Sequence, residues 1–169
     1  ISLNQNDSKC YFNLGALHER KGNTDAASKC FVSALRIDPS YVKAGHRLLN
    51  LAEQTGNVEA LLLARRSLVG EENGRELLAT LLVELAEGEA KILDNMQGLP
   101  PTIPEGPELA KEAVELCGDN ITLKGRALSA SGQHTEAVKC WKKIIETDKT
   151  NPESWIGLAR ALEAAGDLN

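Results

Sequence analysis

Residues 8–41 read SKCYFNLGALHERKGNTDAASKCFVSALRIDPSY, and this stretch decides the fold. Two runs with helical spacing are separated by Gly22, which predicts the end of one helix and the start of another. Gly15 and Ala27 are small enough for two helix backbones to approach closely. Pro39 ends the second run because proline cannot continue a helix. The residues expected to pack between these two antiparallel helices are Tyr11, Leu14, Gly15 and His18 on the first and Ala27, Phe31 and Ala34 on the second.

The order of these residues resembles the tetratricopeptide repeat, with an aromatic residue, a Leu-Gly pair, an A-x3-F-x2-A run and a closing proline. His18 stands where the family usually has tyrosine. The resemblance implies an all-α, right-handed α-solenoid of antiparallel helix pairs, forming a single domain over residues 1–169. The same period predicts repeats at 8–41, 42–75, 76–117 and 118–151, and a partial repeat at 152–169.

The middle of the chain departs from this period. Residues 74–97 predict a longer helix rich in Leu and Ala. The segment GLPPTIPEGP at 98–107 contains four prolines, which exclude a helix there. A helical pattern resumes over 105–117, so we interpret 76–117 as one repeat with an insertion at 98–107. Such an insertion is either a tolerated surface loop or an edge that contacts a partner.

Composition and motifs favour a non-enzymatic protein without a metal or cofactor. The three histidines lie in different repeats, and no glycine-rich phosphate loop is present. The cysteines are too far apart for a local metal motif; those at equivalent places, Cys30 and Cys140, predict buried thiols. With no apolar run long enough for a membrane span and no secretion signal, we expect a cytoplasmic or nuclear protein. The histidines are His18, His46 and His134, and the other cysteines are Cys10 and Cys117.

The last predicted repeat lacks its second helix. We therefore expect a fragment of a longer protein. The apolar face of 152–165 is then expected to be partly exposed, and self-association through this truncated repeat is predicted.

In the resembled family, the first helix of each repeat lines a concave groove, which implies a site for a peptide segment of another protein. The groove residues expected from this are Lys9, Phe12, Asn13, Lys43, His46, Arg47, Asn50, Arg126 and Arg160. Further positions on the same faces are Ala16, Arg20, Gln54, Thr122, Ser129, Glu153 and Ile156. Lys and Arg outnumber acids on these faces although the chain carries a net charge of −5, so we predict an acidic or carboxylate-ended ligand.

Three of these residues suggest a more specific ligand. Asn13, Lys43 and Arg47 fall where chaperone-binding members of the family hold the terminal carboxylate and last aspartate of a peptide. Arginine can hold a carboxylate with two parallel hydrogen bonds, lysine supplies a point charge and asparagine an amide donor. The resemblance thus implies a carboxylate clamp and a chaperone-associated partner.

Other functions compete with a binding groove. The chain could be a rigid structural subunit of a large assembly that binds through its edges, its insertion and its terminal faces. Nucleic acid is not expected, because aromatic residues for base stacking make up only 4% of the chain and the net charge is negative. A sugar-transferring member of the family carries a row of asparagines along its groove, and Arg47 and Arg126 interrupt such a row here.

Overall fold

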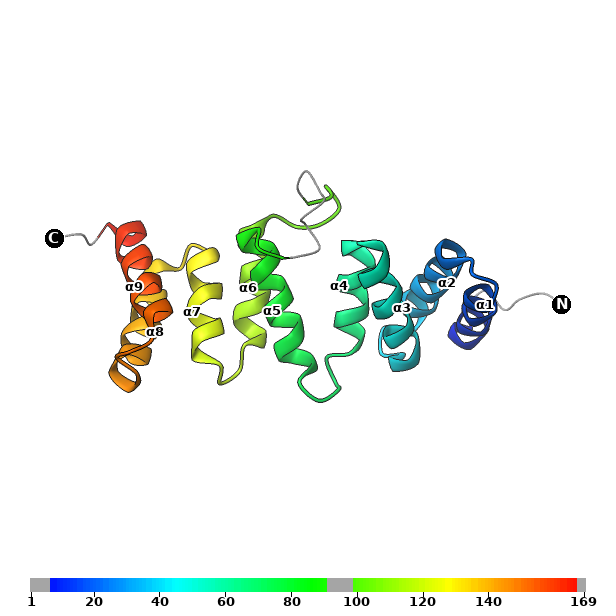
Figure 1. The fold of residues 1–169 in the computed structure, drawn as a ribbon, viewed down its shortest axis with the longest axis horizontal. Helices are drawn as coiled ribbons and strands as arrows, with labels where there is room; N and C mark the ends of the chain where they lie inside the picture. The colour runs from blue at the N-terminus through cyan, green and yellow to red at the C-terminus, as the bar shows by residue number, and fades with distance from the viewer. Residues whose placement is uncertain (1–6, 91–98, 167–169) are drawn as a thin grey trace. The chain divides into compact units, whose positions relative to one another are not determined.

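The computed structural model describes residues 7–90 and 99–166. The described residues form α-helices joined by turns and loops, with no β-strand among them, which confirms the predicted all-α class. None of the helices in this part of the chain combines the length and apolar character that a membrane crossing requires. The helices, labelled in Figure 1, are α1 (Ser8–Arg20), α2 (Thr24–Ile37), α3 (Val42–Thr55), α4 (Val58–Ser67), α5 (Gly74–Glu87), α6 (Gly106–Leu116), α7 (Ile121–Ala130), α8 (His134–Thr147) and α9 (Pro152–Ala165).

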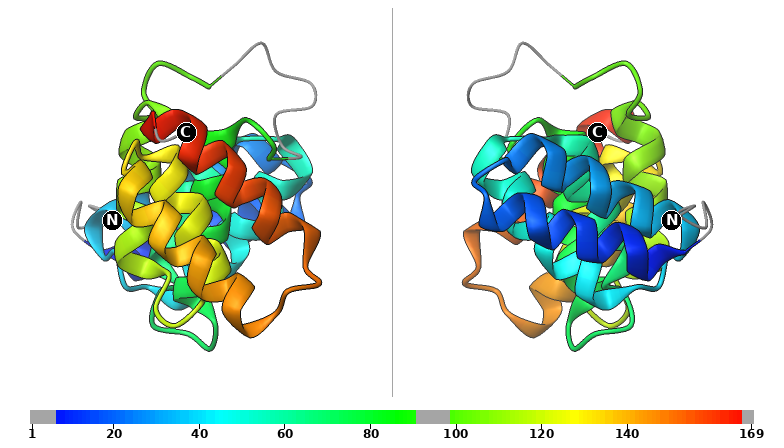
Figure 2. Two further views of the ribbon diagram at one scale, coloured as in Figure 1. Left: turned by 90° about the vertical axis from the view of Figure 1, so that its left-hand side faces the viewer. Right: turned by 90° about the vertical axis from the view of Figure 1, so that its right-hand side faces the viewer.

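Contacts between Cα atoms divide the described residues into two compact units. Unit 1 comprises residues 7–75 and 99–102, and unit 2 comprises residues 76–90 and 103–166. In unit 1, α2 packs against α1, α3 and α4; in unit 2, α7 packs against α6 and α8, and α8 packs against α9. Figure 2 shows α1 beside α2 in one view and α8 beside α9 in the other. Each unit is therefore built from helical hairpins, as expected for a helical repeat, while the predicted single domain and its repeat boundaries stay predictions.

The helix ends follow from capping residues and glycines. The side chain of Asp7 accepts a hydrogen bond from the backbone N–H of Lys9 (2.9 Å) at the start of α1, and Asn151 does the same for Glu153 (3.0 Å) in α9. Gly22, between α1 and α2, has a φ of +74°, a left-handed conformation that glycine adopts without strain. The predicted break at Gly22 is confirmed.

The core of unit 1 forms where the pattern of residues 8–41 predicts it. Ala27, Phe31 and Ala34 are all fully buried. A Cβ atom at Gly15 would lie 2.6 Å from Cε1 of Phe31, so the aromatic ring rests directly on the backbone of α1. The sequence-based prediction that Gly15 permits close helix packing is therefore confirmed.

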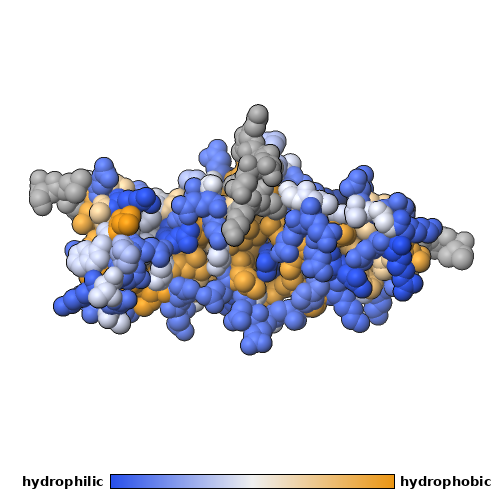
Figure 3. Space-filling view, viewed as in Figure 1, coloured by the Kyte–Doolittle hydropathy of each residue, from blue (hydrophilic) through white to orange (hydrophobic). Residues whose placement is uncertain are grey.

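Unit 2 has an equivalent core around Trp141, which is 2% exposed. The indole lies against Gly125 of α7 and Gly157 of α9: Cβ atoms there would lie 2.9 and 2.5 Å from Cε2 of Trp141. On the face that Figure 3 shows, hydrophobic surface lies between hydrophilic side chains. The remaining buried members of the cluster around Trp141 are Leu128, Ala137, Val138 and Ala161.

The structure corrects the middle of the chain at two places. Helix α5 ends at Glu87, and Gly88 (φ +74°) turns the chain, so the predicted helix over 74–97 is wrong at residues 88–90. The rest of that prediction, and the first residue of the insertion, lie outside the described residues. Helix α6 begins at Gly106 and includes Pro107 in its first turn. Proline is tolerated there because the N–H groups of the first turn have no partner within the helix. The non-helical segment therefore ends at Glu105.

The expected burial of Cys30 and Cys140 is not observed. Both are partly exposed, because their positions on α2 and α8 do not face fully into the cores. Cys117 is the buried thiol instead, and it donates to the backbone oxygen of Ala113 (3.0 Å). Burial raises the pKa of Cys117 to about 11, which keeps this thiol protonated at neutral pH.

Candidate functional site

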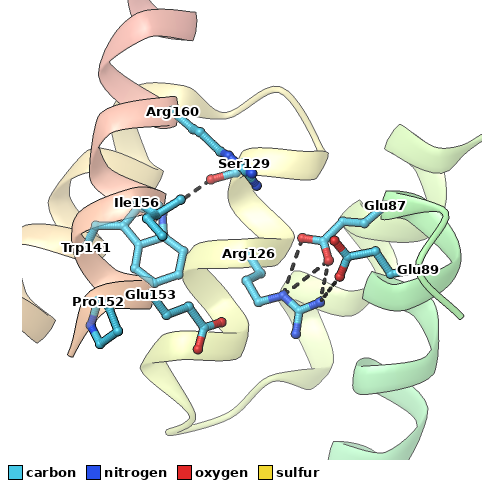
Figure 4. Close-up of a pocket in the computed structure, with 10 residues that line it drawn as sticks. Glu87, Glu89, Arg126, Ser129, Trp141, Pro152, Glu153, Ile156 and Arg160 are labelled. Atoms are coloured by element: carbon cyan, nitrogen blue, oxygen red, sulfur yellow. Dashed lines mark hydrogen bonds and ion pairs between the residues drawn. The ribbon is translucent and has the colours of Figure 1, made fainter.

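A pocket of about 470 Å³ opens in unit 2 between α7, α9 and the end of α5 (Figure 4). Asn120 caps α7 by accepting from the N–H of Leu123 (3.0 Å), and its amide donates to Glu76 of α5 (2.7 Å). The N-cap Asn151 and Pro152 fix the first turn of α9. Local capping therefore sets the helices that carry the pocket walls.

The apolar part of the pocket comes from Trp141 and Ile156. Ile156 is 54% exposed and lies outside the core cluster around Trp141. The N–H of the Trp141 indole donates to Oγ of Ser129 (3.4 Å), so one edge of the buried ring is oriented toward the pocket. In Figure 4 the side chains of Trp141 and Ile156 lie side by side. Together they offer a surface on which an apolar group of a ligand could be buried.

The charged part of the pocket centres on Arg126. Its Nε donates to Oε2 of Glu87 (3.2 Å), its terminal Nη2 donates to the same carboxylate, and Nη2 also approaches Glu89 (3.4 Å). The side chains of Arg126 and Glu87 are 26% and 23% exposed, so this contact is partly shielded from water. Hydrogen bonding to Glu87 is the main cause that raises the pKa of Arg126 above its ordinary value. The guanidinium is thus already bound by carboxylates of its own chain.

The structure brings together most of the unit 2 residues that the sequence assigns to a groove, and Thr122 is the exception. Arg126 and Arg160 line this pocket, along with Ser129, Glu153 and Ile156 from the same predicted faces. The pocket also includes Glu87 and Glu89, which sequence reasoning missed. The signal that could have found them is Gly88, whose place after an apolar helical run is typical of a helix end.

In unit 1, the residues of the predicted clamp are exposed. Asn13 lies on α1, and Lys43 and Arg47 lie on α3. The guanidinium of Arg47, 52% exposed, pairs with the carboxylate of Glu19 at 3.3 Å. The helical pattern places Glu19 at the margin of the predicted groove, and here it pairs with a predicted ligand-binding arginine, as Glu87 does with Arg126. The basic groove stays a prediction.

The other predicted groove residues of unit 1 differ in their surroundings. Lys9 and His46 are exposed. Asn50 lines a second pocket, of about 540 Å³, together with Glu19 and Glu53. Lys9 and His46 do not line this second pocket.

Phe12, expected to face a ligand, packs within the protein. Its ring lies 5.7 Å from the ring of Phe31 and 5.3 Å from that of Tyr41, measured between ring centroids. Tyr41 lies in the turn before α3, so the helical spacing of α1 could not predict this contact. The side chain of Phe12 is accordingly half-buried.

Comparison with known proteins identifies the first repeat. A family model described as the tetratricopeptide repeat matches residues 8–41. The chain carries a tetratricopeptide repeat. The matched stretch spans α1 and α2 and contains the Gly15–Phe31 contact. A tetratricopeptide-repeat fold supports a general role as a protein–protein interaction scaffold.

Two curated relatives are similar over almost the whole length of the chain. They are the proteins named Protein O-mannosyl-transferase TMTC3 from Homo sapiens and from Mus musculus, each 20% identical over 166 residues. The alignment covers 94% of this chain and 18% of each relative. The chain therefore spans less than a fifth of the length of the curated relatives it matches.

Two solved structures are also similar. One is described as the crystal structure of MamA protein, with 16% identity, a TM-score of 0.46, and coverage of 95% of this chain and 83% of that one. The other is described as a thermophilic TPR protein in Thermus thermophilus, with 20% identity, a TM-score of 0.40, and coverage of 96% of this chain and 84% of that one.

Among the residues that the structure describes, no group of three or more His, Cys, Asp or Glu side chains is arranged to hold a metal ion. The pocket in unit 2 instead combines an apolar surface with both signs of charge. Ligand sites commonly combine an apolar surface with a few charged or polar groups in this way.

Proposed function

We propose that this chain is a non-enzymatic scaffold that binds a segment of a partner protein in the pocket between α7 and α9. One observation carries the proposal: the half-exposed Ile156, which lines the pocket together with the almost fully buried indole of Trp141, forms an apolar surface within a charged rim. Fully burying one apolar side chain contributes about 1.5–3 kcal/mol, so a single anchor residue of the partner would supply much of the affinity. The charged rim would set its orientation and association rate.

Fluorescence anisotropy with short labelled peptides tests this proposal. The peptides share one central leucine, and binding is measured for the wild type and for Ile156→Asp, which places a charge in the apolar surface. We expect this variant to lose at least about tenfold in affinity, equivalent to roughly 1.4 kcal/mol. Leu17→Asp is the matched control, because Leu17 is 52% exposed on α1 in unit 1 and should leave binding unchanged. Equal affinities for Ile156→Asp and the wild type would refute a site at this pocket.

In unit 1, the proposal extends to a carboxylate-ended peptide held by Asn13, Lys43 and Arg47. Support comes from the exposure of all three side chains. Since Glu19 already pairs with Arg47, such a peptide must displace that carboxylate before it can bind. Arg47→Ala should then abolish binding of an acidic peptide with a free C-terminus and have no effect on its amidated form. Binding of both peptide forms to both proteins would remove the clamp from consideration.

A structural subunit of a larger assembly is the second candidate function. Large apolar side chains outside the pocket favour it: Leu17, Leu77 and Trp155 are 52%, 46% and 50% exposed. Trp155 on α9 also supports the predicted self-association. Light scattering of the wild type against Trp155→Ser distinguishes these cases, since a surface that joins copies of the chain would lose its larger species in the variant. Cytoplasmic or nuclear location stays a prediction.

A further inference from the structure

Two charged residues of the unit 2 pocket have no ion-pair partner among the residues that the structure describes. Arg126 is bound by Glu87 and Glu89, but Glu153 and Arg160 form no ion pair in this part of the chain. Glu153 lies near enough to Arg126 to help raise its pKa, yet it accepts no hydrogen bond from the guanidinium. A ligand that enters the pocket therefore meets one carboxylate and one guanidinium that are available for pairing.

These two charges lie on opposite sides of the apolar surface. Glu153, Ile156 and Arg160 follow one another at i, i+3 and i+7 along α9, which places them on one face of the helix. At a rise of 1.5 Å per residue, Glu153 and Arg160 are about 10 Å apart along the helix axis. In Figure 4, Ile156 and Trp141 lie in the middle, with Arg160 on one side of them and Glu153 on the opposite side. The wall thus presents a negative group, an apolar group and a positive group in order.

The spacing of the two charges suits a short extended segment. An extended chain advances about 3.3 Å per residue and points successive side chains to opposite faces. Residues i, i+2 and i+4 therefore face one wall over about 13 Å, and the flexible side chains of lysine and glutamate adjust this length to the distance of about 10 Å between Glu153 and Arg160.

We propose, on the basis of the function proposed above, that the bound segment is extended and dipolar. It carries a basic residue that faces Glu153, an apolar residue against Ile156 and Trp141, and an acidic residue that faces Arg160. The apolar residue follows the first charged residue by two positions, and the basic and acidic residues are four positions apart, so that all three side chains face the same wall. Glu89, whose side chain is 65% exposed, adds a further carboxylate to the pocket, whereas Arg126 is withheld from the ligand by its own partners.

Four labelled peptides of equal length test this assignment: Lys-Ala-Leu-Ala-Glu, Lys-Ala-Leu-Ala-Lys, Glu-Ala-Leu-Ala-Glu and Gln-Ala-Leu-Ala-Gln, each flanked by the same neutral residues. Because an extended peptide can bind in either chain direction, the charges are varied rather than their order. We expect the wild type to prefer the dipolar peptide by about tenfold over both like-charged peptides at low salt, with less preference at high salt.

Two charge-reversal variants give the sharper test. Glu153→Lys should transfer the preference to Glu-Ala-Leu-Ala-Glu, and Arg160→Glu should transfer it to Lys-Ala-Leu-Ala-Lys. Both sites are exposed, so the fold should tolerate these changes, and circular dichroism checks this. Equal binding of all four peptides, or a wild-type preference for Glu-Ala-Leu-Ala-Glu, would overturn the dipolar assignment and leave the proposed function standing. Absence of binding by all four peptides would overturn the proposed function as well.

Discussion

Gly157 of α9 packs directly on the indole of Trp141 in α8. A Cβ atom at this glycine would lie 2.5 Å from Cε2 and 2.8 Å from Cδ2 of the ring, closer than side chains normally approach. Gly125 of α7 contacts the same ring. One tryptophan is therefore held between the backbones of two helices that both line the pocket, which couples the stability of unit 2 to the shape of its site.

Gly157→Ala should destabilise unit 2 by about 1–2 kcal/mol. Overpacking of a core typically costs about 1–3 kcal/mol, and the better helix propensity of alanine offsets up to about 1 kcal/mol of this. Urea unfolding followed by circular dichroism measures the change. In the Trp141→Phe background the smaller ring leaves room, so Gly157→Ala should cost less there than in the wild type. An equal cost in both backgrounds would show that the methyl group meets something other than the indole.

A double-mutant cycle should find stronger coupling between Arg126 and Glu87 than between Arg47 and Glu19. The first pair is held by more than one hydrogen bond and its side chains are about one quarter exposed, whereas Arg47 is 52% exposed. We expect about 1 kcal/mol for the first pair and less than about 0.5 kcal/mol for the second. The cycles use Arg126→Gln with Glu87→Gln, and Arg47→Gln with Glu19→Gln, measured by urea unfolding. Similar coupling in both pairs would mean that shielding from water contributes nothing.

Cys117 should be the slowest of the four cysteines to react with a thiol reagent at pH 8. With a pKa of about 11, about 0.1% of this thiol is ionised at that pH, against about 10% for a thiol at the ordinary value near 9. Mass spectrometry of the partly labelled protein identifies the order of reaction, and urea should remove the difference. Fast labelling of Cys117 in the folded protein would contradict its observed burial.

The same thiol gives a pH dependence of stability. A pKa raised in the folded state means that folding favours the neutral thiol, so this contribution is present below pH 9 and is lost as the pH rises toward 11. The stability difference between the wild type and Cys117→Ala, measured by urea unfolding at a series of pH values, should therefore decrease over this range. A difference that stays constant from pH 8 to 11 would contradict the raised pKa.

Local features of the chain were predictable because they depend on residues close in sequence. The turn at Gly22 and the burial of Phe31 follow from one repeat, whose glycine, small residues and aromatic ring must meet when two short helices fold back. The position of Trp141 follows from the same period further along the chain. In the candidate site, the faces that carry Arg126 and Arg160 were predictable for this reason.

Contacts between distant residues were not predictable from helical spacing. Arg126 meets Glu87 and Glu89, which are 37–39 positions earlier in the chain. Glu89 reaches the pocket because α5 ends at Glu87, two residues before it, which a pattern rich in Leu and Ala does not reveal. The ring contact of Phe12 with Tyr41 was not predictable for a similar reason, since Tyr41 belongs to a turn. Periodicity identifies the face on which a side chain lies, but the partner from another element decides whether that side chain remains available.

The contacts of α7 with α5 have a consequence for how the chain can change over evolution. Asn120, the N-cap of α7, binds Glu76 near the start of α5, and Arg126 of α7 binds Glu87 at its end. The proline-rich segment belongs to the stretch of chain that connects α5 with α7. Doubling the length of a flexible loop costs only about 0.6 kcal/mol in closure entropy. Insertions and deletions in that segment could therefore accumulate between related proteins while the pocket wall that Glu87 helps to form is inherited unchanged.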